Sequence, residues 1–305
     1  MTAGALDTIV NAFVQALLAG QMALARYSLG ILGFAGIVAW CLALWPALAN
    51  QEHGLAAATF VAIRIAVYYW ISVSLAAGAL ALFGTFLQWG TAAGGGGFTA
   101  AMFLSPSSML DAGFRAARPV QDFLLHFTGP GVLWNAHIII PYMLAYWITV
   151  LSFALIAFHL IVTIIEFHMA VMVGSVLIPW GALHHTAFLA EFGIAWIVAG
   201  LIRVLLTASI LSIAIPLFAT LAYTTTPTKF GDPTFYSAAV FAITSAIFAI
   251  LAWQIPSRAS TVGGRGMALG LTGGMLVPHT MTQVIRAAGS ASVRGTSRLL
   301  TGIRA

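Results

Sequence analysis

The feature that most constrains this chain is a series of long segments without a single Asp, Glu, Lys or Arg. The longest hold far more than the roughly 20 apolar residues that a membrane-spanning helix needs. Only 6% of the 305 residues are charged, whereas a soluble domain has about 25%. The strand-like alternation of a membrane barrel is absent, so spanning helices are the workable backbone. We therefore predict an all-α, polytopic membrane protein. The charge-free segments are 27–51, 65–110, 123–165, 167–190, 192–202 and 235–257.

The charges and breaks between these segments divide the chain into five predicted regions. Residues 1–25 form an amphipathic helix, with Ile9, Val10 and Phe13 on its apolar stripe. The first two spans and a glycine-rich, amphipathic central loop come next, followed by a transmembrane core whose last helix is ended by Pro256. A basic, flexible tail completes the chain. The last four regions cover 26–90, 91–133, 134–256 and 257–305.

The tail holds six of the 12 cations and no acid. The positive-inside rule places such a tail in the cytoplasm, where it would attract anionic lipid headgroups. Contact with DNA is the alternative, since a basic flexible segment is also typical of nucleic-acid binding. The tail cations are Arg258, Arg265, Arg286, Arg294, Arg298 and Arg304.

The central loop is too polar to span a membrane and too apolar to be a free linker. Four consecutive glycines, 94–97, disfavour a helix at its start. A helix is then predicted to begin at Ser105 and Pro106, with Asp111 in its first turn and Pro119 dividing it. We interpret this loop as facing a partner or the membrane interface. Its candidate contact residues are Ser105, Pro106, Ser108, Asp111, Phe114, Arg115 and Arg118.

The number of spans depends on the charge-free segment 167–190. Its 24 residues would measure about 36 Å as one helix, enough to cross the membrane once. That alternative gives six spans and a cytoplasmic N-terminus. The break at Pro179, Trp180 and Gly181 instead permits a re-entrant hairpin, with five spans and a periplasmic N-terminus. The sequence leaves both alternatives open.

The ionisable residues near this break do not have the spacing of a metal or catalytic site. Glu166 and His168 would point about 200° apart on a helix, and His184 and His185 also diverge. Cys41 is the only cysteine, and the phosphate-binding and hydrolase motifs are absent. We predict no catalytic residue, metal or cofactor, and expect bound phospholipids at most.

Arg203 is the charge that most needs an explanation, because it lies inside an apolar segment. An intramembrane arginine indicates function unless a partner neutralises it. Glu166 on a neighbouring helix is the predicted partner. Two interpretations stay open, a structural ion pair and a cation that lines a pore.

The segment from Ile164 to Leu206 resembles the core of the TrbL/VirB-type inner-membrane subunit of type IV secretion and conjugation systems. The matching order is Ile165-Glu166-Phe167, then Pro179-Trp180-Gly181, then Thr186 to Glu191; residues 105–113 also resemble that family's central loop. The resemblance implies that the subunit core or ring contacts are shaped by Glu166, Pro179, Trp180, Gly181, Phe188 and Glu191.

The resemblance also implies a homo-oligomeric ring, with a pentamer as the expectation, in the bacterial inner membrane. Its implied partners are a minor pilin-like stalk protein facing residues 105–123, other inner-membrane subunits, ATPases, membrane lipids, and the DNA or protein in transit. Pilus assembly and substrate transfer would be its role. The alternative is a stand-alone solute channel or secondary transporter with Arg203 in the pathway.

Overall fold

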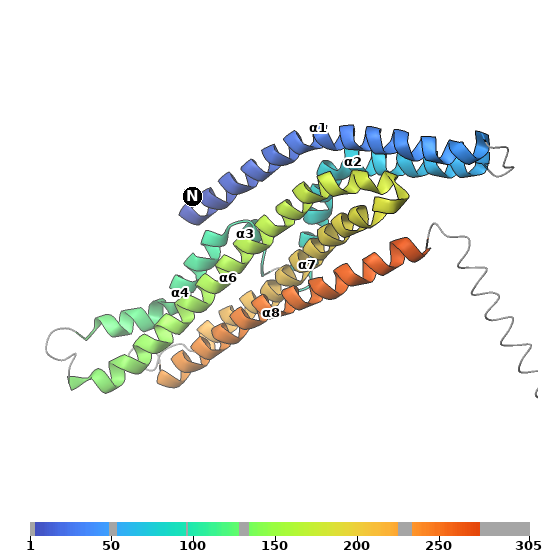
Figure 1. The fold of residues 1–305 in the computed structure, drawn as a ribbon. Helices are drawn as coiled ribbons and strands as arrows, with labels where there is room; N and C mark the ends of the chain where they lie inside the picture. Colours follow the sequence, from blue (N-terminus) through green and yellow to red (C-terminus); the bar gives the residue numbers. More distant parts are fainter. Residues whose placement is uncertain (1–3, 49–53, 96, 128–133, 225–233, 275–305) are drawn as a thin grey trace, which may run out of the picture.

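The structure, a computed structural model, describes residues 4–48, 54–95, 97–127, 134–224 and 234–274. Within these ranges the chain is all-α, as predicted, and forms a bundle of long helices (Figure 1). Five of the described helices, α1, α2, α6, α7 and α8, are long and apolar enough to cross a membrane. The chain is therefore a multi-pass membrane protein. The elements are α1 (Ala5–Leu48), α2 (Gly54–Ala92), α3 (Ala100–Phe103), α4 (Pro106–Leu125), α6 (Ala136–Leu177), η1 (Ile178–Ala182), η2 (His184–Thr186), α7 (Ala187–Thr224) and α8 (Phe235–Gly274).

The segment 167–190 does not form a span of its own. Its first part completes α6, which ends at Leu177, and two short 3-10 turns then reverse the chain into α7. Pro179 lies near the start of the first turn, where its missing N–H costs no helical hydrogen bond. The chain therefore enters and leaves this turn on one side. The six-span alternative is wrong for the described chain.

Two of the long helices run through boundaries that the sequence suggested. α1 is continuous for 44 residues, so the N-terminal amphipathic segment and the first span are one helix. Its buried face includes Asp7 and Val10, whereas Ile9 and Phe13 are exposed, so only part of the predicted apolar stripe packs on the described bundle. α8 contains Pro256 and continues to Gly274 instead of ending there.

The glycine-rich segment after α2 lets the chain approach α7 closely. Methyl groups at Gly90, Gly94 and Gly97 would overlap Ala208, Ser212 and Pro216, which are spaced one helical turn apart on α7. The Ser212 hydroxyl donates a hydrogen bond to the Gly90 carbonyl at 3.1 Å. Gly95 has a φ of 76°, in the left-handed region that favours glycine. The glycines thus allow the chain to leave the helical conformation after α2. They also allow the end of α2 to contact α7 closely.

α4 packs lengthwise on α6, beside the lower part of the bundle (Figure 1). Its buried residues recur at helical spacing, and Gly113 lies so close to Phe153 that a methyl group there would overlap the ring. Pro119 lies inside α4 without dividing it, contrary to the prediction. Asp111 lies beyond the first turn of the helix, also contrary to the prediction.

The α1–α2 hairpin is displaced along the bundle relative to the other helices. Gly20 of α1 contacts Met172 near the end of α6, and Leu32 and Ala35 pack on Ala182 in the turn. The remaining part of α1 extends past the turn with α2 alone beside it (Figure 1). This part of the hairpin exposes most of its large apolar side chains.

Candidate functional site

The start of α4 is capped by a carboxylate of α1, from a position 100 residues earlier in the chain. Asp7 of α1 accepts a hydrogen bond from the Ser107 N–H at 2.9 Å and another from the Ser107 hydroxyl. The first N–H groups of a helix have no partner within it. Ser105 occupies the N-cap position, but its side chain makes no capping hydrogen bond. Asp7 therefore caps α4 from a distant segment.

The outer face of α4 presents a regular pattern of charges. Asp111 and Arg115 form an ion pair of 3.2 Å, and Arg118 and Asp122 approach to 3.9 Å, with all four side chains exposed. Phe114 lies exposed between them. Surface pairs at this spacing stabilise a helix by only about 0.2–0.5 kcal/mol. These ion pairs therefore contribute little to the stability of the fold. They form an exposed charged surface on α4.

The remaining predicted contact residues in this region have local roles. Pro106 is buried at the first helical position. The Ser108 hydroxyl donates a hydrogen bond to the Ser105 carbonyl at 2.7 Å, which tightens the first turn.

The α6–α7 turn is packed against α2 rather than open. Pro179 and Gly181 are buried, and a methyl group at Gly181 would overlap the Tyr68 ring. The Thr186 hydroxyl donates a hydrogen bond of 2.6 Å to the Trp180 carbonyl and closes the turn. Three of the residues chosen from sequence, Pro179, Trp180 and Gly181, thus lie together at one structural junction.

A charged residue beside this junction is buried. Glu191 is 8% exposed, and its charge and that of Arg64 both lie within electrostatic range of Tyr68. Phe188, one turn before Glu191, is 61% exposed, so it does not contribute to the core of the described subunit. His184 and His185 are both exposed in the second 3-10 turn.

Glu166 of α6 and Arg203 of α7 form an ion pair between adjacent helices. The pairing predicted from the sequence is therefore present. Arg203 is the more enclosed partner, with 17% of its side chain exposed against 34% for Glu166. His168 points elsewhere, since its ring packs beside Phe83 of α2 and its Nδ1 lies 2.8 Å from the Ile164 carbonyl. Within the described ranges, no three His, Cys, Asp or Glu residues gather closely enough to hold a metal ion.

Three further residues near the ion pair are not among the predicted site residues. His159 lies two helical turns before Glu166, is buried, and stacks on Trp253 of α8 with ring centroids 5.9 Å apart. The charge of Arg203 lies within electrostatic range of it. The Nε2 atom of His159 and the hydroxyl of Thr207 are buried without a hydrogen-bond partner. A lone histidine in an apolar helix gives no sequence signal of such a contact.

A comparison with protein families decides the class of this chain. The family model of the TrbL/VirB6 plasmid conjugal transfer proteins matches residues 47–255. The chain belongs to this family.

The matched range of this TrbL/VirB6 chain contains α4, the α6–α7 turn and the Glu166–Arg203 pair. Family membership makes the chain a membrane component of a conjugal transfer system. No curated protein matches the chain at a significant level.

Two features of the TrbL/VirB6 chain fall outside the matched range. Asp7 precedes it, and the basic tail follows it. Arg258 is exposed on α8, and Arg265 lies within the same helix. The other tail arginines, Arg286, Arg294, Arg298 and Arg304, lie outside the described residues.

Proposed function

We propose that this chain is an inner-membrane platform subunit of a type IV secretion machine of the conjugation type. It forms a homo-oligomeric ring, with a pentamer as the expectation, at the base of the stalk. The ring supports pilus assembly and the transfer of DNA or protein, while ATPases elsewhere in the machine supply the energy. The observation that carries this proposal is the TrbL/VirB6 family match over residues 47–255.

The structure adds a specific surface to this proposal. α4 is fixed on α6 along one side and capped by Asp7, so its outer face is a rigid support. That face carries Phe114 between two exposed ion pairs. A central apolar side chain within a polar rim is typical of protein interfaces. We assign this face to the minor pilin-like stalk protein.

The ion pair favours the platform over a stand-alone solute channel. The charge of Arg203 is neutralised by Glu166, with which it forms an ion pair between α7 and α6. A cation that attracts a solute through a pore would need its charge available. We interpret the pair as a link between the two helices.

The α4 surface is tested by conjugation in donor cells whose only copy of the protein is a variant. In the double substitution Asp111→Arg with Arg115→Asp, the i,i+4 ion pair is retained and the charge pattern is reversed. We expect transfer frequency to fall at least about tenfold, corresponding to about 1.4 kcal/mol of lost binding, with unchanged protein level. His185→Ser, which changes an exposed residue of the second 3-10 turn and not of α4, serves as the control. Undiminished transfer by the double variant would refute the assignment.

The role of the ion pair is tested by removing its charges singly and together. Arg203→Gln leaves Glu166 alone in an apolar setting, and such a loss costs about 3–5 kcal/mol when the remaining charge is fully buried. Because Glu166 is a third exposed, we expect the lower end of that range. Glu166→Gln combined with Arg203→Gln should recover thermal stability in detergent and transfer in cells. A pore-lining arginine predicts the opposite, namely that the double variant stays inactive and that the purified wild-type protein alone conducts solute in vesicles.

A further inference from the structure

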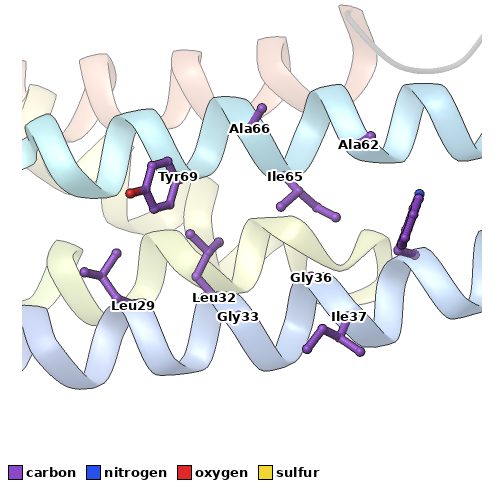
Figure 2. A pocket seen from close by; sticks show the side chains of 10 residues that line it. Leu29, Leu32, Gly33, Gly36, Ile37, Ala62, Ile65, Ala66 and Tyr69 are labelled. Carbon is purple, nitrogen blue, oxygen red and sulfur yellow. The ribbon is translucent and has the colours of Figure 1, made fainter.

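Buried polar groups lie where α6, α7 and α8 pack side by side (Figure 1). This setting differs from the groove between α1 and α2, whose lining residues are mostly apolar and carry no charge (Figure 2). At the three-helix junction, His159 is 7% exposed and Thr207 is fully buried. Neither the His159 Nε2 atom nor the Thr207 hydroxyl has a hydrogen-bond partner among the described residues. Buried polar atoms are almost always hydrogen-bonded in proteins, so these two groups require an explanation.

The Thr207 hydroxyl is not turned back onto its own helix. A buried threonine inside a helix often donates to the carbonyl four residues earlier. Thr149 and Thr163 of α6 do so, with hydrogen bonds of 2.9 and 2.8 Å. Thr207 makes no such bond within the described chain, so its hydroxyl is available to a group outside the α7 backbone.

His159 and Thr207 face the same crossing of two helices. His159 lies seven residues, or two turns, before Glu166 on α6, so the two side chains share one face of the helix. Thr207 lies four residues after Arg203 on α7, so these two also share a face. Glu166 and Arg203 form the ion pair that joins the helices. The charge of Arg203 also lies within electrostatic range of His159, which agrees with this placement.

The offset between the two groups suits one water molecule. α6 and α7 are joined by the 3-10 turns and run antiparallel, so His159 and Thr207 lie on the same side of the ion pair. At 1.5 Å per residue they are about 10.5 and about 6 Å from it along the helices, an offset of about 4.5 Å. A direct hydrogen bond spans at most about 3.2 Å between heavy atoms, whereas two bonds through one water reach about 5.6 Å. A single bridging water therefore fits this offset.

We propose that a buried water molecule bridges the Nε2 atom of His159 and the hydroxyl of Thr207. Water suits either tautomer of the ring, because it donates to an unprotonated Nε2 and accepts from a protonated one. A buried water makes two to four hydrogen bonds, and these two side chains supply two. Glu166 is a third exposed, which gives water a way in beside the ion pair. The bridge is a second link between α6 and α7, and it carries no charge.

X-ray footprinting of the purified full chain in detergent tests the bridge directly. Brief X-ray pulses convert bound water to hydroxyl radicals, which oxidise the side chains beside it, and mass spectrometry measures the rate at each residue. We expect His159 to be oxidised severalfold faster than Phe167, a fully buried ring of the same helix. Thr207→Val removes the hydroxyl and should reduce the rate at His159 severalfold. Thr149→Val, which removes a hydroxyl bonded within its own helix, should leave that rate unchanged.

A double-mutant cycle on the thermal midpoint provides an independent measurement. His159→Phe keeps an aromatic ring against Trp253 and removes the Nε2 atom. If one water joins the two side chains, each single change already displaces it. The double variant, His159→Phe with Thr207→Val, should therefore melt a few degrees above the midpoint that the two single shifts predict by addition.

Two results would overturn the proposal. In the first, His159 is oxidised no faster than Phe167, or at the same rate with and without the Thr207 hydroxyl. In the second, the midpoint shifts of the two single variants add. A low rate at Phe167 shows in each sample that the fold is intact. Either result leaves the secretion role untouched, because that role is measured separately by transfer frequency.

Discussion

At Gly181 the absence of a single methyl group determines whether α2 can lie against the α6–α7 turn. A Cβ atom there would overlap the Tyr68 ring and would also press on Ala190. All three groups belong to closely packed elements, so none can withdraw without moving a helix. The Pro-Trp-Gly break is therefore a packing junction as well as a reversal of the chain.

Gly181→Ala should destabilise the protein by about 1–3 kcal/mol, the usual cost of overpacking. The control is Gly84→Ala in α2, where the added methyl group meets no atom within 4 Å and helix propensity gains up to about 1 kcal/mol. The measurement is the thermal midpoint of the purified protein in detergent. Equal midpoints for the two variants would contradict the close packing of Gly181 against Tyr68.

Residue-scale chemistry could be predicted from the sequence only where a charge demanded a partner. Arg203 in an apolar segment called for an acid, and Glu166 was among the few available. The stacking of His159 on Trp253 could not be found, because a neutral histidine can lie in an apolar helix without a countercharge. Nor could Asp7 be matched to Ser107, since 100 residues separate them and no spacing rule connects separate helices.

Among the elements, α4 shows how a helix depends on contacts made outside itself. Its sequence provides a good start, with Pro106 at the first helical position, and that start was predicted. Pro119 was predicted to divide the helix and does not. Pro119 is exposed, so the backbone carbonyl that loses its hydrogen bond there can reach solvent. Meanwhile Met109, Gly113 and Ala117 keep the opposite side packed on α6.

Asp7→Ala should loosen the first turn of α4, because it removes the acceptor for the Ser107 N–H. Loss of such a cap costs about 0.5–2 kcal/mol. Hydrogen exchange followed by mass spectrometry should show faster exchange in peptides that cover Ser107 and Ser108. Thr8→Ala, which changes an exposed side chain of the same helical turn, should leave that exchange unchanged. Unaltered protection in Asp7→Ala would mean that α4 is capped by other groups.

For the whole molecule, five spans would place the two termini of the chain on opposite sides of the membrane. The positive-inside rule predicts a cytoplasmic tail, and on that prediction α8 runs inward and the α6–α7 turn lies on the cytoplasmic side with the α1–α2 loop. The same prediction puts α4 on the periplasmic side, where the proposed stalk would stand. The five-span alternative from the sequence already implied this arrangement. The charges of the central loop could not decide between five and six spans, because Asp111 and Asp122 offset Arg115 and Arg118.

This topology predicts a difference in labelling between two exposed positions. In a Cys41→Ser background, Arg118→Cys on α4 should react with a membrane-impermeant maleimide in intact spheroplasts. His185→Cys in the turn should react only after the membrane is opened. The two substitutions change exposed residues, so the fold should tolerate both. If His185→Cys alone were labelled in intact spheroplasts, the orientation of the protein in the membrane would be the opposite of the predicted one.

The single unbroken α1 also has a mechanical consequence. Near its start it is fastened to α4 through Asp7, at Leu32 and Ala35 it rests on Ala182, and beyond that point it carries α2 with it. Between these points it also packs on α6, with Val10 in the main core and Gly20 against Met172. One continuous helix therefore connects the start of α4, the end of α6 and the far part of the α1–α2 hairpin, so these three regions cannot shift independently of one another.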